Sequence, residues 1–458
     1  MVLEKTASME LHNKKTLVVG LGATGIATAL FLREQGAQVT VSEKKNREDL
    51  PAAAQQLCNK GVVLETGEHR NQTFLKAGLI IVSPGVSLET PPLQEAAAKG
   101  VEIISEIELA YRFITVPIIA VTGTNGKTTT VNLMADLFAS SGKRAFLGGN
   151  VGNPLIEYVL NRNHEDYIIA EVSSFQLEGI RNFKPFVSVL LNLNHDHLDR
   201  YVSYSDYIAA KARLFINQTP EDYAILNADD PEVQALAPSI RATKLSFSCE
   251  HEVSCGIFCK DHQAYFTQGT DQARFPLDHI LLPGKHNRHN IMAAIAVGQL
   301  CGCSREAIQH TIENFRGLPH RLEWVGKVDQ IGFYNDSKAT NVSSTVRALE
   351  ALNPPVILIA GGKDKGGDYH PLIPLIEQKV KTLILIGEAQ EKMVQAFQNT
   401  TSIVCAETFE DAFMKSLDHA AEGDTVLLSP ACSSFDMFKS YEERGEKFKA
   451  LVRNLSND

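Results

Sequence analysis

The residues whose types and spacing point most directly to chemistry lie between Val116 and Thr130, in the sequence VPIIAVTGTNGKTTT. An apolar, β-branched run of strand length leads into Gly123 and Gly126 and then into Lys127. Apolar residues at helical spacing follow, so the segment predicts a strand, a glycine-rich loop and a helix. The amides of such a loop and the helix N-terminus bind phosphate oxygens, a lysine adds positive charge, and a threonine hydroxyl can bind Mg²⁺. The stretch therefore predicts a nucleoside triphosphate site.

This loop is shorter than the common P-loop, because only Thr124 and Asn125 separate its glycines. In this form, GTNGKTT, it resembles the loop of the Mur ligase and folylpolyglutamate synthase superfamily. Members of that superfamily form an amide bond at the expense of ATP, through an acyl phosphate. The resemblance implies an ATP site with a catalytic lysine, formed by Gly123, Thr124, Asn125, Gly126, Lys127, Thr128 and Thr129.

Further polar residues follow two later strands of the central region. The predicted strand Tyr167–Ala170 leads to Glu171, and the predicted strand Val187–Leu193 leads to NHDHLD, which contains His197. A carboxylate at the carboxyl end of a parallel strand, facing a phosphate-binding loop, suits Mg²⁺. One imidazole among oxygen ligands is compatible with Mg²⁺, whereas this set does not predict a zinc cage. Together with Thr128, these residues predict a magnesium site.

Lys211 lies on a predicted helix, Tyr207–Phe215, fourteen residues after His197. By residue type alone it is a solvated charge. The run NHDHLDRY followed by AAKARLF is, however, similar to the stretch in which Mur ligases carry a carbamylated lysine. That resemblance implies that Lys211 is carbamylated and that it binds a second Mg²⁺ together with His197, both as catalytic residues.

The N-terminal third contains G-x-G-x-x-G at Gly20, after the predicted strand Thr16–Val19, and a second predicted strand, Gln38–Val41, that ends near Glu43. This pattern alone is typical of dinucleotide binding and keeps an NAD-dependent oxidoreductase open as an alternative. The segment before the ATP loop is short for a full dinucleotide fold, and the superfamily uses such a loop for the UDP of a UDP-sugar. The resemblance implies a UDP site at Gly22, Ala23, Thr24, Glu43, Lys44 and Gly85. Further candidates for holding this substrate are Asn150, Ser173 and Gln176.

Beyond the central region, strands and helices alternate, with predicted strands at Phe333–Asn335, Val356–Ala360, Thr382–Ile386 and Thr425–Leu428. The alternation predicts a mainly parallel α/β sheet. Three polar loops follow these strands, NDSKATN, GGKDKGG and SPACSSFD, and side chains there gather where such sheets bind ligands. Asn287 and Asn290, at the start of an earlier helix, are candidates for the adenine side of ATP.

The motifs GLPHR, NDSKATN, GGKDKG and SPACSSFDMF, in this order, are similar to those of the Mur ligases that add D-glutamate, and the match extends from about Gly20 to Tyr441. The resemblance implies addition of D-glutamate to UDP-N-acetylmuramoyl-L-alanine during peptidoglycan precursor synthesis. It places Arg321 and Asp336 at the nucleotide and His320 and Lys338 close to the reaction. The implied D-glutamate site consists of Lys338, Thr340, Lys365, Ser434 and Phe435.

A chain of 458 residues corresponds to about three domains of ~150 residues. We expect an α/β protein with an N-terminal Rossmann-like UDP-binding domain (1–105), a central P-loop-type ATPase domain with a mainly parallel sheet (106–317) and a C-terminal Rossmann-like domain that binds the amino acid (318–458). The expected cofactors are ATP and two Mg²⁺ ions. Another ligase of the superfamily, such as a folylpolyglutamate synthase, is an alternative that the G-x-G-x-x-G segment disfavours. A nucleotide-binding scaffold without catalysis is a further alternative.

The formal net charge of −10 argues against a nucleic-acid partner, which would need basic clusters. The N-terminus lacks the pattern of a signal peptide, and no apolar run approaches the ~18 residues of a membrane helix. Eight cysteines are scattered without the spacing of a zinc site and are interpreted as free thiols of a reducing compartment. We therefore expect a cytoplasmic monomer whose partners are its small-molecule substrates.

Overall fold

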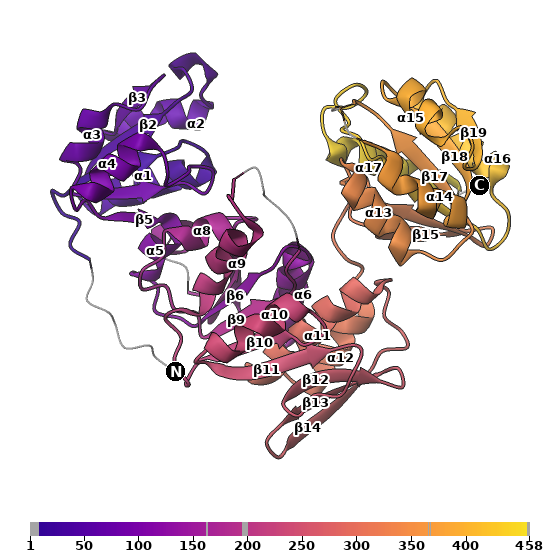
Figure 1. The fold of residues 1–458 in the computed structure, drawn as a ribbon, viewed down its shortest axis with the longest axis horizontal. Coiled ribbons are helices and arrows are strands. Elements are labelled where there is room, and N and C mark those ends of the chain that lie inside the picture. Colours follow the sequence, from indigo (N-terminus) through magenta and orange to yellow (C-terminus); the bar gives the residue numbers. More distant parts are fainter. Residues whose placement is uncertain (1–8, 162–163, 195–199, 365, 367, 456–458) are drawn as a thin grey trace. The chain divides into compact units, whose positions relative to one another are not determined.

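The computed structural model describes residues 9–161, 164–194, 200–364, 366 and 368–455 (Figure 1). The chain divides into two compact units: residues 1–279 with 289–313, and residues 280–288 with 314–458. Within the described residues the strands form three sheets, of five, nine and six strands. The α/β architecture with three mainly parallel sheets confirms the predicted fold class, whereas the domain boundaries at 105 and 317 stay predictions.

The five-stranded sheet has the order β3-β2-β1-β4-β5 and is parallel throughout. Its elements are β1 (Lys15–Val19), α1 (Ala23–Glu34), β2 (Gln38–Glu43), α2 (Ala52–Gln55), β3 (Val63–Thr66), α3 (Asn71–Lys76), β4 (Leu79–Val82), α4 (Pro91–Ala98) and β5 (Ile103–Ser105). The edge strand β3 was not predicted, because none of its four residues is buried and it lacks an apolar face to detect.

The nine-stranded sheet has the order β14-β13-β12-β11-β10-β9-β6-β8-β7, parallel from β7 to β12 and antiparallel in the last two pairs. Its strands are β6 (Ile118–Thr122), β7 (Ala145–Gly149), β8 (Tyr167–Glu171), β9 (Val187–Leu190), β10 (Tyr223–Asn227), β11 (Thr243–Ser248), β12 (Gly256–Lys260), β13 (Gln263–Gln268) and β14 (Asp271–Pro276). The helices in this part of the chain are α5 (Glu106–Tyr111), α6 (Lys127–Ser140), α7 (Leu155–Leu160), α8 (Ser174–Glu178), α9 (Tyr204–Ala212), α10 (Pro231–Leu236), α11 (Lys285–Leu300) and α12 (Arg305–Asn314).

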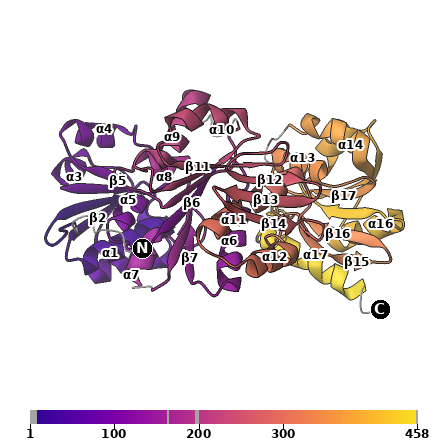
Figure 2. The same ribbon diagram turned by 90° about the horizontal axis from the view of Figure 1, so that it is seen from below.

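β6 lies between β8 and β9, so the carboxyl ends of these three parallel strands meet at one edge of the sheet. This arrangement brings the GTNGKTT loop, Glu171 and the residues after β9 together, as expected for parallel strands. The predicted helix Tyr207–Phe215 is α9 followed by a 3-10 turn over Arg213–Phe215. The first two sheets share a core, because α1 of the N-terminal sheet packs against α7 of the central part (Figure 2).

The six-stranded sheet has the order β15-β16-β20-β17-β18-β19, with only β15 antiparallel to its neighbour. Its elements are β15 (Glu323–Val328), β16 (Ile331–Asn335), α13 (Val342–Ala351), β17 (Val356–Gly361), α14 (Ile373–Lys379), β18 (Val380–Ile386), α15 (Gln390–Phe397), β19 (Ser402–Cys405), α16 (Phe409–His419), β20 (Thr425–Leu428) and α17 (Tyr441–Leu455). Alternate residues of its inner strands enter separate cores: Leu358 and Leu427 on one face, Ile357 and Val426 on the other. Burial on both faces explains their continuous apolar runs.

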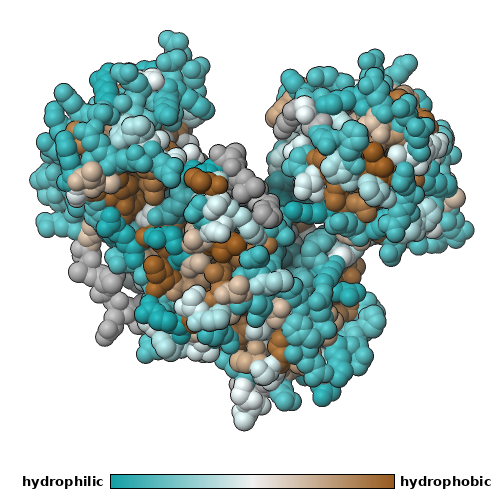
Figure 3. All heavy atoms as spheres, in the orientation of Figure 1, coloured by the Kyte–Doolittle hydropathy of each residue, from teal (hydrophilic) through white to brown (hydrophobic). Residues whose placement is uncertain are grey.

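The surface in view in Figure 3 is mostly hydrophilic, in keeping with 21% charged residues in the sequence. Within the part of the chain that the structure describes, no helix combines the length and apolar composition needed to cross a membrane.

Candidate active site

The GTNGKTT loop connects β6 to α6 and depends on both of its glycines. Gly126, at φ +85°, precedes the first residue of α6, and a Cβ there would collide with the side-chain amide of Asn290. Gly123, at φ +147°, would place a Cβ 3.1 Å from that of Leu191. Positive φ angles and close neighbours together favour glycine at these two positions.

The residues that follow β9 hold this loop in place. Asn192 accepts a hydrogen bond from the Asn125 amide at 2.9 Å and donates one to the Asn125 carbonyl at 3.1 Å. The hydroxyl of Thr124 accepts from the Asn194 amide at 2.9 Å and lies 3.0 Å from the Tyr207 hydroxyl. The loop is thus fixed by the protein itself, which lowers the ordering cost of binding a phosphate chain.

Two lysines converge on one carbonyl of this loop. Lys127 donates to the carbonyl oxygens of Gly123 and Thr124 at 2.8 and 3.0 Å, and Lys211 donates to that of Gly123 at 2.9 Å. The side chain of Lys211 is only 2% exposed and its ammonium lies 4.8 Å from the centre of the Tyr207 ring. The interpretation of Lys211 as a solvated charge is therefore wrong, because α9 packs this residue against the loop. The carbamate stays a prediction.

Glu171, at the end of β8, has the character of a cation ligand. Its side chain is 2% exposed, and Oε1 accepts a hydrogen bond from the amide of Asn150 at 2.9 Å. Within the described residues, the buried Oε2 has no hydrogen-bond partner. Burying a carboxylate oxygen without a donor is costly, and a bound cation would remove that cost. The residues present therefore fit Mg²⁺, with Thr128 in the first turn of α6 as a second candidate; His197 lies outside the described residues.

Ser173 and Gln176, predicted to hold substrate, form the capping box of α8. The Gln176 side chain accepts from the amide and hydroxyl of Ser173, both at 3.0 Å, and Ser173 accepts from the Gln176 amide at 3.4 Å. Their side chains thus fix the start of the helix next to Glu171. A role in substrate binding remains a prediction for both.

A pocket of about 650 Å³ opens at the carboxyl ends of the five-stranded sheet. Six of the residues predicted for the UDP substrate line it: Gly22, Thr24, Glu43, Lys44, Gly85 and Asn150. Ala23 is not among its lining residues and begins α1. Glu43 accepts from the Leu21 amide at 2.7 Å, and a Cβ on Gly25 would collide with the carbonyl of Gly20, so the glycine pattern lets α1 dock closely on β1. A volume of this order suits a nucleotide-sized ligand.

Other lining residues of this pocket were not predicted: His69, Ser83, Ser87 and Thr90. They lie in loops after β3 and β4, and their signal was their position after strands, the edge at which such sheets bind ligands. His69 contacts the Ser42 hydroxyl at 2.8 Å. Burial and the nearby Lys44 lower the pKa of His69, so the imidazole is neutral at pH 7.

In the second unit, His320 of the GLPHR motif occupies a tightly packed position. It has φ +64° and is 5% exposed, and a Cβ on Gly445 would collide with its ring. The Nδ2 atom of Asn335 donates to Nδ1 of His320 at 2.9 Å. The Oδ1 atom of Asn335 accepts a hydrogen bond from the Ser337 amide at 3.1 Å. Burial, followed by the charge of Lys449, lowers the pKa of His320. The lowered pKa favours the neutral imidazole, and donation by Asn335 to Nδ1 favours the tautomer with the proton on Nε2.

Asp336, predicted to contact the nucleotide, is a buried residue of the NDSKATN loop. Its carboxylate accepts from the Leu322 amide at 3.0 Å and from the Ser429 hydroxyl at 2.8 Å. Burial raises the pKa of Asp336 to about 7, although both hydrogen bonds and the charge of Arg321 oppose this rise. Part of the population is thus protonated at neutral pH.

Arg444, which the sequence analysis did not single out, joins two of the predicted ligand loops. It is 1% exposed and donates to the hydroxyl and carbonyl of Ser337 at 3.0 and 2.9 Å and to the carbonyl of Cys432 at 3.2 Å. The NDSKATN and SPACSSFD loops are therefore fixed to each other through α17. An arginine on an amphipathic helix such as α17 gives no sign of this in the sequence.

The residues predicted for D-glutamate differ in their exposure. The Lys338 ammonium lies 5.2 Å from the centre of the Tyr441 ring. The backbone carbonyl of Lys338 accepts a hydrogen bond from the Thr340 amide. Ser434 is buried, whereas Phe435 is 65% exposed. Lys365 lies outside the described residues. The D-glutamate assignments stay predictions.

Comparisons with known proteins define the class to which this fold and site belong. Three family models match the chain: the Mur ligase MurD-like N-terminal domain over residues 14–105, the Mur ligase middle domain over 121–298 and the Mur ligase glutamate ligase domain over 320–432. Among solved structures, a pseudomurein peptide ligase type C from Methanothermus fervidus superposes with a TM-score of 0.56 at 20% identity, covering 96% of this chain and 100% of that one. The shared class is a three-domain Mur ligase fold.

Curated relatives cover nearly the whole chain. The UDP-N-acetylmuramoylalanine--D-glutamate ligase of Geotalea uraniireducens (strain Rf4) is 49% identical over 449 residues, which are 98% of this chain and 99% of that protein. The protein of the same name from Citrifermentans bemidjiense is 47% identical over 445 residues, 97% of this chain and 98% of the relative. The chain therefore belongs to the Mur ligase family, among the relatives that carry this name.

Proposed function

We propose that this protein is an ATP-dependent ligase that joins D-glutamate to UDP-N-acetylmuramoyl-L-alanine and forms ADP and phosphate. The observation that carries this proposal is the 49% identity over 98% of the chain to a UDP-N-acetylmuramoylalanine--D-glutamate ligase. The reaction serves peptidoglycan precursor synthesis. Because ATP and the UDP-linked substrate are cytoplasmic compounds, we propose that the enzyme acts in the cytoplasm.

The first role of the site is to bind the triphosphate. The fixed GTNGKTT loop offers its backbone and the N-terminus of α6, and Lys127 supplies positive charge at Gly123. Glu171 and Thr128 would hold Mg²⁺, which neutralises charge on the phosphates. We propose that carbamylated Lys211 and His197 hold a second Mg²⁺. A carbamate keeps one N–H, so the contact of Lys211 with the Gly123 carbonyl is compatible with this modification.

The alanyl carboxylate of the UDP substrate attacks the γ-phosphorus of ATP and displaces ADP, which gives an acyl phosphate. We propose that the pocket beside Gly22, Glu43 and Gly85 holds the UDP part of this substrate. The amine of D-glutamate then attacks the acyl carbon, phosphate leaves, and the amine loses a proton. We propose that Lys338, Thr340 and Ser434 bind the carboxylates of D-glutamate, while the neutral imidazole of His320 lies close to the reaction.

Phosphate release tests the proposal directly. The enzyme is supplied with ATP, Mg²⁺ and UDP-N-acetylmuramoyl-L-alanine, with D-glutamate, L-glutamate or no amino acid. We expect steady release only with D-glutamate, together with a product whose mass has increased by one glutamyl residue. Equal turnover with L-glutamate, or turnover without the UDP substrate, would contradict the proposal.

A further inference from the structure

Three side chains of the kinds that bind transition metals meet in the first unit, beside Asn290, a candidate for the adenine side of ATP. Asp229 follows β10, Cys249 follows β11, and His289 lies on α11. A carboxylate oxygen, the Sγ atom and an imidazole nitrogen of these residues all lie within 4.8 Å of one another. Segments separated by up to sixty residues thus present one oxygen, one sulfur and one nitrogen ligand to the same point.

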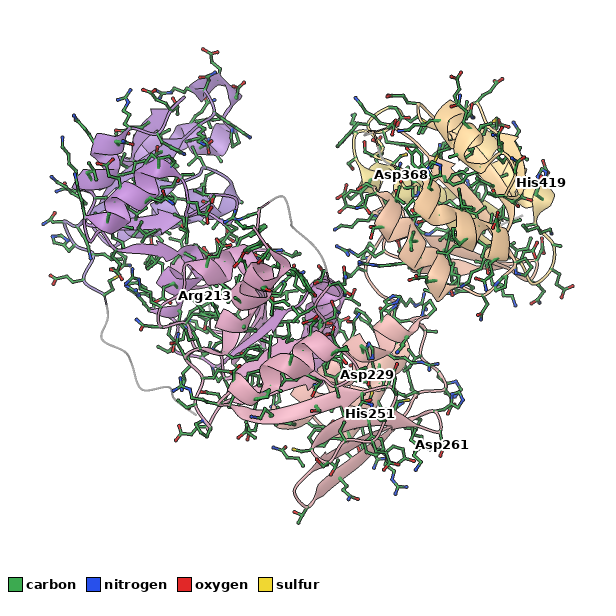
Figure 4. All side chains as sticks on the ribbon, in the orientation of Figure 1. Arg213, Asp229, His251, Asp261, Asp368 and His419 are labelled. Atoms are coloured by element: carbon green, nitrogen blue, oxygen red, sulfur yellow. The ribbon has the colours of Figure 1, made fainter. Side chains whose placement is uncertain are left out.

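The carboxylate of Asp229 is at the centre of this cluster. Its Oδ2 is 2.8 Å from His289 Nε2, and its Oδ1 is 3.4 Å from Nδ1 of His251, two residues after Cys249. Asp229 is 2% exposed and His289 15% exposed, whereas His251 is 54% exposed. Figure 4 labels Asp229 and His251 in the same part of the first unit. The cluster is therefore buried on one side and open to solvent on the side of His251.

The ligand set selects the kind of metal. A thiolate and an imidazole with one carboxylate suit Zn²⁺, while Mg²⁺ and Ca²⁺ prefer oxygen ligands alone. Zinc bonds of about 2.0–2.3 Å in a tetrahedron keep ligand atoms roughly 3.3–3.8 Å apart. The ligand atoms of Asp229, Cys249 and His289, all within 4.8 Å of one another, lie close to that spacing. We propose that Asp229, Cys249 and His289 bind a zinc ion, with His251 as the fourth ligand.

Hydrogen bonds from neighbouring groups fix the orientation of the Asp229 carboxylate. The Ser248 hydroxyl lies 2.5 Å from Oδ1 and the Cys249 amide 2.7 Å from Oδ2. Such contacts orient a ligating carboxylate.

The zinc ion would be structural, and its position connects it to the ATP loop. His289 precedes Asn290, whose side chain lies against Gly126. Asp230, next to Asp229, accepts a hydrogen bond from the Leu193 amide at 2.9 Å. Leu193 lies in the sequence between Asn192 and Asn194, the two asparagines that hold the loop. A metal that joins the ends of β10 and β11 to α11 would therefore stabilise the surroundings of the loop without touching substrate.

Cobalt substitution tests the site in the full-length, untagged enzyme. The protein is stripped with a chelator and titrated with Co²⁺ in saturating Mg²⁺, which occupies the oxygen-ligand sites. We expect one Co²⁺ per chain, the visible bands of tetrahedral cobalt and a near-ultraviolet thiolate-to-cobalt band. Cys249→Ser should lose the thiolate band, whereas the control Cys405→Ser, which removes an exposed cysteine, should keep it.

A second measurement uses the unsubstituted enzyme, so it does not depend on a variant that folds. Alkylation by iodoacetamide is measured for each cysteine by peptide mass spectrometry. Zinc should slow the alkylation of Cys249 at least tenfold and leave that of Cys405 unchanged. Zinc should also raise the thermal unfolding temperature of the enzyme. Absence of the thiolate band in the unsubstituted enzyme, or equal alkylation of Cys249 with and without zinc, would overturn the proposal.

Discussion

Lys127 and Lys211 direct their ammonium groups to the same oxygen, the carbonyl of Gly123, from two different helices. Two like charges this close repel each other in the absence of an anion, and the repulsion is greatest where one of them is buried. A polyphosphate, or conversion of Lys211 to a carbamate, would relieve it. The geometry therefore makes separate predictions for the two residues.

Replacement of Lys127 by methionine should abolish the use of ATP. The variant keeps the length of the side chain but removes the charge at the phosphate loop, and we expect kcat/KM for ATP to fall by at least about a hundredfold. ADP formation with all substrates present measures this. Lys99→Met, which removes an exposed lysine at the C-cap of α4, is the control and should behave like the unsubstituted enzyme. Unchanged ADP formation in Lys127→Met would contradict the ATP site.

Replacement of Lys211 by alanine should also abolish activity, but for a reason that added carboxylates can repair. If Lys211 acts as a carbamate, formate or acetate should enter the space left in the variant and restore part of the turnover, and should not do so in Lys127→Met. In the unsubstituted enzyme, ¹³C-labelled bicarbonate should give a carbamate signal in the NMR spectrum that is absent from Lys211→Ala. An active Lys211→Ala enzyme, or no such signal, would argue against the carbamate.

At the scale of elements, α17 has a structural function that its sequence conceals. Through Arg444 it fixes the loop after β16 to the loop after β20, and burial lowers the pKa of this guanidinium to about 10. A buried charge of this kind is retained in a fold only if its hydrogen bonds offset much of the cost of desolvation. Arg444 is thus a positioning residue for the two loops.

Arg444→Met should therefore impair the binding of D-glutamate more than that of ATP. Charge-assisted hydrogen bonds contribute about 1.5–3 kcal/mol each, so the loops should lose their fixed arrangement. We expect KM for D-glutamate to rise tenfold or more, KM for ATP to change little, and Arg444→Lys to recover part of the loss. Arg453→Met, at an exposed position of the same helix, is the control. A lower unfolding temperature with unchanged KM for D-glutamate would assign Arg444 to stability alone.

At the scale of the whole molecule, the first two sheets are connected by a buried carboxyl group. Glu106, in the first turn of α5, accepts from the Ile156 amide of α7 at 2.6 Å, and α7 packs against α1. Burial, with the nearby Glu157, raises the pKa of Glu106 to about 7, against the hydrogen bonds from Ile156 and Leu155. Among the described residues its Oε2 has no hydrogen-bond partner. This connection is therefore sensitive to pH.

The sign of the pH effect follows from the raised pKa. The pKa of Glu106 is about 7 in the folded protein and near 4.5 in the unfolded chain. Its contribution to the free energy of unfolding is therefore fully present below about pH 4.5 and is lost as the pH rises through about 7. The loss amounts to roughly 3 kcal/mol at most. Glu106→Gln should lack this dependence, so urea unfolding at pH 5 and pH 8 should differ less in the variant. An equal difference in both proteins would contradict the assignment.

Local sequence determined much of this protein. The strand, loop and helix around GTNGKTT, the glycine turn after β1 and the inner strands of the C-terminal sheet were all predicted, because each rests on neighbouring residues: apolar runs, helical spacing and glycines at fixed intervals. The edge strands β3, β15 and β19 lack such a signal, since most of their residues are exposed or only partly buried. The family resemblance added the reaction and the residue assignments.

Only the tertiary structure decided which charges are buried and which distant side chains meet. Lys211 and Arg444 look like surface cations in the sequence, yet packing of α9 and α17 buries both. Asp229, Cys249 and His289 are separated along the chain and show no metal-binding spacing, yet parallel strands and α11 bring their ligand atoms together. The physical reason is the same in each case: burial and side-chain proximity depend on contacts between segments far apart in sequence, which no local pattern records.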